Sequence, residues 1–125
     1  MFAGATSSAG EEPGTFTAYI GTSPEHRAQS IEVFLAEMEK LRNEAPTDEE
    51  VRDVQDYLTG SFPLGLERNT SLVRYAINAK RYGLGFDYVN RYPDLIRSVT
   101  AADVLRVARA HLHPDRLTVV SAGAG

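Results

Sequence analysis

Five amphipathic helical patterns follow one another in this chain, and they limit the class of fold that its 125 residues can adopt. In each pattern apolar side chains recur three or four residues apart, so one stripe of a helix faces a core. Ser23-Pro24 predicts a helix start, because serine caps helices and proline suits the first helical position. The other predicted helices begin after Thr47, near Asn69, near Asp87 and after Thr100.

Two of these starts carry an explicit capping pattern. Thr47-Asp-Glu-Glu50 predicts a capping box, and the run from Thr100 to Asp103 repeats the arrangement with aspartate at the third helical position. Proline marks interruptions: Pro63, with its neighbouring glycines, is expected to end the second helix, and Pro93 to kink or divide the fourth.

Strand-forming segments lie at both ends of the helical series. Residues 2–7 and the alternating run 15–21, joined by turn residues, predict a hairpin with a long loop. Residues 116–122 are rich in β-branched side chains and predict a third strand, which returns to the hairpin to bury its apolar faces. The predicted fold class is α+β: a small, mostly antiparallel sheet packed on about five helices, in the order β-β-α-α-α-α-α-β. Such a narrow sheet has an open edge, which attracts another chain or a missing strand.

Composition fits one globular domain. The chain is 42% apolar and contains no cysteine, which excludes disulfides, thiolate metal sites and a cysteine nucleophile. We expect residues 1–125 to form a single domain, with a mobile first strand and hairpin loop at 1–13, a core at 14–122 and a tail at 123–125. We find no signal peptide and no apolar run near the roughly 18 residues of a membrane helix. The compartment is unknown, and would be cytoplasmic or periplasmic if the source is bacterial.

The net charge of −4 conceals an asymmetry. Residues 1–65 carry 4 basic and 12 acidic side chains, whereas residues 66–125 carry 9 basic and 5 acidic ones. A nucleic-acid binder usually concentrates its basic side chains on one face, and here the basic excess is small and spread over several helices. We interpret the charges as solvated helix faces and expect no nucleic-acid partner.

Side chains that could carry chemistry are few. The histidines are His26, His111 and His113, and no His-x-x-Glu-His or His-Glu-x-x-His string occurs. A helix would point His111 and His113 in different directions, so they would chelate one metal poorly. Acidic side chains crowd the start of the second helix, where they suit the positive end of the helix dipole: Asp48, Glu49, Glu50, Asp53 and Asp56. We predict no catalytic residue and no metal ligand in this chain, and leave its substrate-binding residues unknown.

Seven aromatic side chains lie between Tyr57 and Tyr92. Tyrosine offers a large contact area and a polar tip, so such a cluster could line a peptide groove. We favour the other interpretation, in which the rings pack helices together with their hydroxyl groups at the rim.

Several segments, in order, resemble one known family. They are the run Gly14-Thr-Phe-Thr-Ala-Tyr-Ile-Gly-Thr-Ser-Pro24, the helix end Glu39-Lys-Leu-Arg-Asn-Glu44, the capped helix from Thr47 to Phe62, the turn Tyr82-Gly-Leu-Gly-Phe-Asp-Tyr88, and the run from Ile96 to Val120. Together they resemble the carboxy-terminal, non-catalytic domain of the pitrilysin/insulinase zinc peptidases, which include the mitochondrial processing peptidase. The resemblance covers nearly all of residues 14–122.

This resemblance implies a role beside a catalytic unit. In the family, the zinc-binding motif belongs to the amino-terminal domain, two similar halves enclose a chamber, and the inactive half supplies walls. The helix that corresponds to the carrier of the family's distal zinc-binding glutamate has Asp53 and Asp56 here. The expected cofactor is therefore zinc in a partner domain or subunit, with none in this chain, and the expected substrate is a peptide.

The resemblance leaves two functions open. This chain could be the non-catalytic portion of a zinc metalloendopeptidase, inert alone, and part of a larger peptidase-like domain. Alternatively, it could be a catalytically dead homologue that acts as a structural or protein-interaction subunit. A homo-oligomer formed through the open sheet edge is a further expected partnership.

Overall fold

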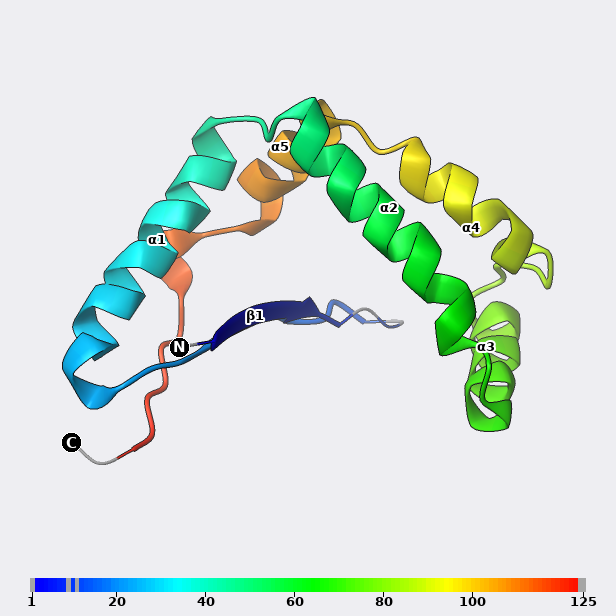
Figure 1. The fold of residues 1–125 in the computed structure, drawn as a ribbon, viewed down its shortest axis with the longest axis horizontal. Helices are drawn as coiled ribbons and strands as arrows, with labels where there is room; N and C mark the ends of the chain where they lie inside the picture. Colours follow the sequence, from blue (N-terminus) through cyan, green and yellow to red (C-terminus); the bar gives the residue numbers. More distant parts are fainter. Residues whose placement is uncertain (1, 9, 11, 124–125) are drawn as a thin grey trace.

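The computed structural model describes residues 2–8, 10 and 12–123, and it has the element order β-β followed by five α-helices (Figure 1). The two strands are β1, Phe2–Ser7, and β2, Phe16–Gly21. The helices are α1, Arg27–Asn43; α2, Asp48–Gly65; α3, Asn69–Arg81; α4, Tyr88–Arg97; and α5, Ala101–His111. Short 3₁₀ turns precede α1 at Pro24–His26 and follow α5 at Pro114–Arg116. This order confirms the predicted α+β class.

The hairpin forms as predicted. β1 and β2 pair antiparallel, in a register that sets Phe2 opposite Gly21 and Ser7 opposite Phe16. On one face the aromatic rings of Phe2 and Tyr19 cover the glycines across from them, Gly21 and Gly4, and a Cβ atom at Gly4 would approach the Tyr19 hydroxyl to 2.5 Å. On the other face Ala18 and Ile20 are half-buried. Cross-strand packing of an aromatic ring over glycine stabilises strand pairs that lack side chains of their own.

Both predicted capping boxes are present. The Thr47 hydroxyl accepts from the Glu50 amide at 3.2 Å, and the Glu50 carboxylate accepts from the Thr47 amide at 2.8 Å. At α5 the same pair of bonds joins Thr100 and Asp103, at 3.2 and 3.0 Å. The predicted cap at Ser23 is wrong in its chemistry, because the Ser23 hydroxyl lies 2.7 Å from Nδ1 of His26 and makes no bond to a backbone amide.

The effects expected of the prolines are only partly found. α2 continues past Pro63 and ends at Gly65, and α4 runs unbroken from Tyr88 to Arg97, so Pro93 does not divide it. Each proline removes a single backbone N–H from its helix. Packing of one helix on the other offsets that loss, because Phe62 of α2 stacks on Tyr92 of α4 at a ring-centroid distance of 3.9 Å.

The predicted carboxy-terminal strand is wrong. The structure has a two-stranded sheet, and between residues 117 and 123 the chain forms neither strand nor helix. The backbone at Leu117 is extended, with φ −75° and ψ 140°, so the β-branched residues do adopt a strand-like local conformation. A strand also needs a neighbouring edge for its hydrogen bonds, and here the segment runs beside the start of α1, where Nε of Arg27 donates to Oγ of Ser121 at 2.7 Å.

The helices form two arms that meet at an apex (Figure 1). α1 packs on α5 in one arm, α2 packs on α4 in the other, and the hairpin lies between the arms. In the described part of the chain the hairpin contacts the helices only weakly, so the predicted layer of helices packed on the sheet does not form. α3 lies at the far end of the second arm.

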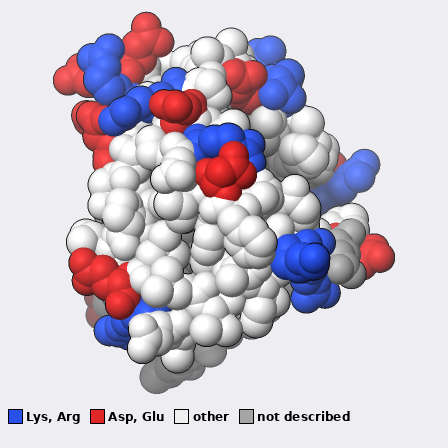
Figure 2. Space-filling model, turned by 90° about the vertical axis from the view of Figure 1, so that its right-hand side faces the viewer, with Lys and Arg blue, Asp and Glu red and all other residues white. Residues whose placement is uncertain are grey.

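The core is small for a chain of this length. Among the described residues the buried apolar side chains are Met38, Ala79 and Ala108. The chain exposes 9842 Å², whereas a compact monomer of 13.7 kDa would expose roughly 6,600 Å². Much of the surface seen from the α3 end is uncharged (Figure 2). This arrangement therefore leaves exposed to solvent about 3,000 Å² of surface that a compact fold of the same mass would bury.

The two capping boxes predict a specific acid sensitivity. Hydrogen bonds from the Thr47 amide and hydroxyl lower the pKa of Glu50 below its usual 4.5, and bonds from the Thr100 hydroxyl and amide, then Arg106, lower the pKa of Asp103 below 3.8. A depressed folded-state pKa contributes stability that is present above the unfolded value and is lost as pH falls through the folded one. We expect the urea midpoint to begin falling below about pH 4.5 because of these caps.

Circular dichroism during urea titration at pH 7 and pH 3 measures this loss. The variant Glu50→Gln/Asp103→Asn should be less stable at pH 7 and should lose less on acidification than the unmodified chain. An equal acid loss in both proteins would contradict a contribution from the caps.

Candidate functional site

The three histidines lie in two separate places. His26 is bonded to Ser23 before α1. His111 ends α5 and His113 lies just past it, where the chain has left the helix, and both line a hollow of about 190 Å³. Nε2 of His113 lies 3.2 Å from the carbonyl oxygen of Ala110, so a proton on that nitrogen would be donated locally. The helix end thus brings the two side chains of the His-x-His pair to the same hollow.

The remaining walls of this hollow are apolar or basic: Phe16, Met38, Leu112, Arg116 and Leu117. Imidazole and guanidinium groups above apolar walls can hold an anionic or carbonyl-bearing group. The described lining includes no carboxylate and no hydroxyl group, so the hollow brings together no nucleophile with a base or with an acid to assist it.

The acidic cluster at the start of α2 has a capping role at one position. Glu50 is held by Thr47, and the acidic side chains around it lie in the first turns, where the helix dipole favours negative charge. Across residues 2–8, 10 and 12–123, no three or more His, Asp or Glu side chains come together in a way that could hold a metal ion.

The aromatic cluster packs helices only in part. Between α2 and α4, the Phe62 ring stacks on Tyr92, and Tyr88 meets Tyr92 edge-on. The pKa of Tyr92 is raised, mainly by burial and to a smaller extent by the charge of nearby Tyr88. The Tyr75 hydroxyl accepts from the Val89 amide at 3.0 Å and donates to the Phe86 carbonyl at 3.3 Å, which secures the loop before α4.

Other aromatic side chains face solvent. Tyr57 is 73% exposed and Phe86 72% exposed. The packing interpretation therefore holds for Phe62, Tyr88 and Tyr92 and fails for Tyr57 and Phe86.

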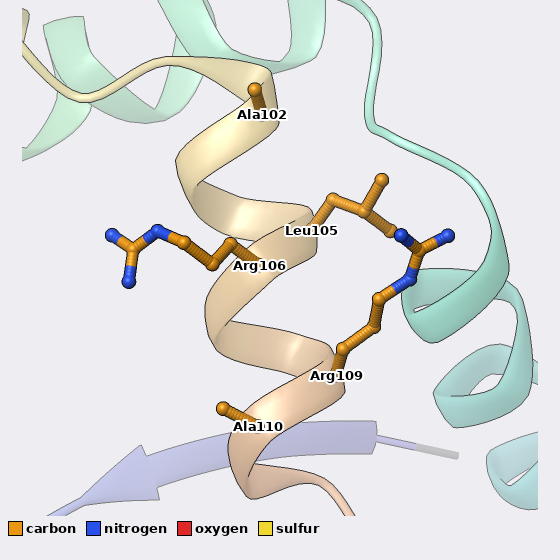
Figure 3. A pocket seen from close by; sticks show the side chains of 5 residues that line it. All are labelled: Ala102, Leu105, Arg106, Arg109 and Ala110. Atoms are coloured by element: carbon orange, nitrogen blue, oxygen red, sulfur yellow. The ribbon is translucent and has the colours of Figure 1, made fainter.

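A second hollow, of about 550 Å³, is lined by residues of α5 alone (Figure 3). Ala102, Leu105 and Ala110 line it together with Arg106 and Arg109, whose side chains extend to opposite sides of the helix. Arg109 donates from Nε to the Arg42 carbonyl at 2.8 Å, which ties α5 to the end of α1, and Arg106 pairs with Asp103 at 3.3 Å. Small side chains flanked by arginines allow close approach of a polypeptide carrying carbonyl or carboxylate groups. Sequence reasoning missed this surface, although the alanines and the arginines were readable signals.

Comparison with known proteins agrees with the sequence resemblance. Residues 1–58 match the family described as the peptidase M16 inactive domain. M16 is the pitrilysin/insulinase family, so the predicted resemblance is confirmed over the segment that contains the hairpin, α1 and the first part of α2. No curated protein and no solved structure matches the chain. None of the described helices combines the length and the apolar character needed to cross a bilayer.

Proposed function

We propose that this chain is a non-catalytic portion of an M16-type zinc metalloendopeptidase, which helps to enclose a peptide substrate beside a zinc-bearing domain and is inert alone. The zinc, its ligands and the group that activates water would all belong to that partner. Residues 1–125 would act as one unit of a larger peptidase-like domain.

One observation supports the proposal most: the chain that matches the M16 inactive domain over residues 1–58 folds as an open arch of two helical arms. A chain that leaves about 3,000 Å² more surface exposed than its mass requires is suited to pack against another unit. The hollows described above offer basic and apolar groups for holding a polypeptide, with no reactive pair among their lining residues.

Reconstitution tests this function. The purified chain, with or without added zinc, is expected to cleave no unstructured peptide, and co-expression with a domain that carries His-x-x-Glu-His should give a complex that does. We expect at least about a hundredfold difference in kcat/KM between the complex and either part alone, since a chamber wall acts by positioning substrate. Zinc-dependent cleavage by the 125 residues alone would contradict the proposal.

The same open surface also supports a second candidate, a structural subunit whose family lost its chemistry. The two candidates differ in the complex. A structural subunit would bind its partner as tightly and leave the rate of peptide cleavage unchanged, whereas a chamber wall raises it.

A further inference from the structure

We propose that two copies of this chain associate through α2 and α3, with α3 of each copy lying against the first half of α2 of the other. This inference goes beyond the proposed function and does not depend on it. It rests on the two exposed apolar stripes described below, on the charges beside them and on the uncovered area.

The first stripe runs along the outer face of α3. Its inner face is occupied, because Tyr75 bonds to the loop before α4 and Ala79 is buried. On the outer face Val73 and Ile77 are 59% and 57% exposed. These two residues share one side of the helix, since positions four apart lie nearly above one another. A helix that exposes apolar side chains on the face opposite its buried face is suited to pack on another helix.

The second stripe runs along α2. One side of this helix packs on α4, through the Phe62 ring and through Nε2 of Gln55, which donates to the Val99 carbonyl at 2.9 Å. Val54 and Tyr57, three residues apart, lie on a different side and are 57% and 73% exposed. This spacing is typical of a helix–helix seam. Leu64 is 64% exposed on the same side, but it lies in the last turn of α2, outside the proposed contact.

The charges beside the two stripes are opposite. The start of α2 carries five acidic side chains, Asp48, Glu49, Glu50, Asp53 and Asp56, against one basic side chain, Arg52. α3 carries Arg74, Lys80 and Arg81 and no acidic side chain. An α3–α3 contact would therefore be repulsive, whereas an α3–α2 contact would be attractive.

Within one copy the complementary segments cannot meet. α2 is an 18-residue helix, roughly 27 Å long. Its acidic start lies at the apex of the arch, and α3 follows its opposite end (Figure 1). A two-fold arrangement of two copies makes the α2–α3 contact twice, as a self-complementary interface requires.

The uncovered area is sufficient for such a dimer. Stable obligate interfaces remove roughly 1,000–2,500 Å² from each partner, and this chain exposes about 3,000 Å² more than a compact monomer. The face on the α3 side is largely uncharged at its centre (Figure 2).

Sedimentation equilibrium of the full chain tests the proposal. We expect a dimer of twice 13.7 kDa at micromolar concentration. Ile77→Glu should raise its dissociation constant at least about tenfold, because it places an acid opposite acidic α2. Val33→Glu is the matched control, since Val33 on α1 is 54% exposed, and it should change the constant less than about twofold. Unchanged helical circular dichroism identifies variants that keep their fold.

Charge reversal adds a test in which the predicted result is the recovery of association when two variants are mixed. Glu49→Lys/Asp53→Lys/Asp56→Lys, which makes the start of α2 net basic, and Arg74→Glu/Lys80→Glu, which makes α3 net acidic, should each prevent self-association. A mixture of the two variants should form a heterodimer. Dimers in either reversed variant alone, or no heterodimer in the mixture, would overturn the inference. So would a chain that is monomeric at 100 µM or that binds only a His-x-x-Glu-His domain. Dimers disrupted by Thr17→Pro in β2 but not by Ile77→Glu would place the contact at the sheet edge and would also overturn it.

Discussion

Replacing Met38 with alanine is expected to lower the free energy of unfolding by about 3 kcal/mol, a large loss for a chain with so small a core. Met38 lies on α1, is 3% exposed and lines the hollow at the end of α5 beside Leu112. It is the largest of the three buried apolar side chains among the described residues, so its truncation leaves a cavity where the first arm is held together.

Urea denaturation followed at 222 nm measures this loss. Met38→Leu nearly conserves volume and should cost less than about 1.5 kcal/mol. Val33→Ala, on the exposed side of the same helix, should change stability by about 0.5 kcal/mol or less. A cost at Met38→Ala no greater than that of this control would mean that the α1–α5 contact does not hold the arm together.

The second large effect is expected at Phe62. Its ring stacks on Tyr92 at 3.9 Å with an interplanar angle of 17°, and it joins α2 to α4. We expect Phe62→Ala to cost about 2 kcal/mol through lost burial and lost stacking. The same change should bring the raised pKa of Tyr92 back toward 10.0, because water then reaches the phenol and favours its ionised form.

Phe86→Ala is the control for this variant, since Phe86 is 72% exposed and lies outside the stack of Phe62 on Tyr92. It should leave both stability and the tyrosine titration, read by absorbance at 295 nm, nearly unchanged. Equal effects at Phe62 and Phe86 would show that the stacked rings do not hold α2 and α4 together.

Local features of the fold were readable from the sequence. Thr47 and Thr100 predict helix starts correctly because a capping box depends on four consecutive residues. The hairpin was readable for a similar reason, since its strands are neighbours in the chain. Ser23 shows the limit even of local reasoning, because His26 competes for its hydroxyl.

Non-local features were not readable. The run 116–122 has strand propensity, but pairing depends on an edge about 100 residues away, and the chain instead bonds Ser121 to Arg27. The apolar stripe of α1 predicts a buried face, yet Leu41 is 40% exposed, because the arms stay apart. Packing between distant segments decides which apolar helix stripes become buried, and helical periodicity does not encode that packing.

The candidate surfaces were foreseen only in part. Helix geometry predicts that His111 and His113 point in different directions, but both line one hollow, because the chain leaves the helix before His113. Their meeting with Arg116 and Phe16 depends on how β2 and the end of α5 approach. The α5 surface with Arg106 and Arg109 was missed, since two arginines three residues apart are ordinary on any solvated helix.

The most direct test of the central claim is peptide cleavage by the reconstituted complex when every histidine of this chain is removed. The complex with His26→Ala/His111→Ala/His113→Ala is expected to keep kcat within about threefold of the unmodified complex, because the proposed function assigns every catalytic group to the partner. Replacing the glutamate of the partner's His-x-x-Glu-His motif should abolish cleavage. A loss of a hundredfold or more in kcat from the triple histidine variant, with binding to the partner intact, would contradict the account.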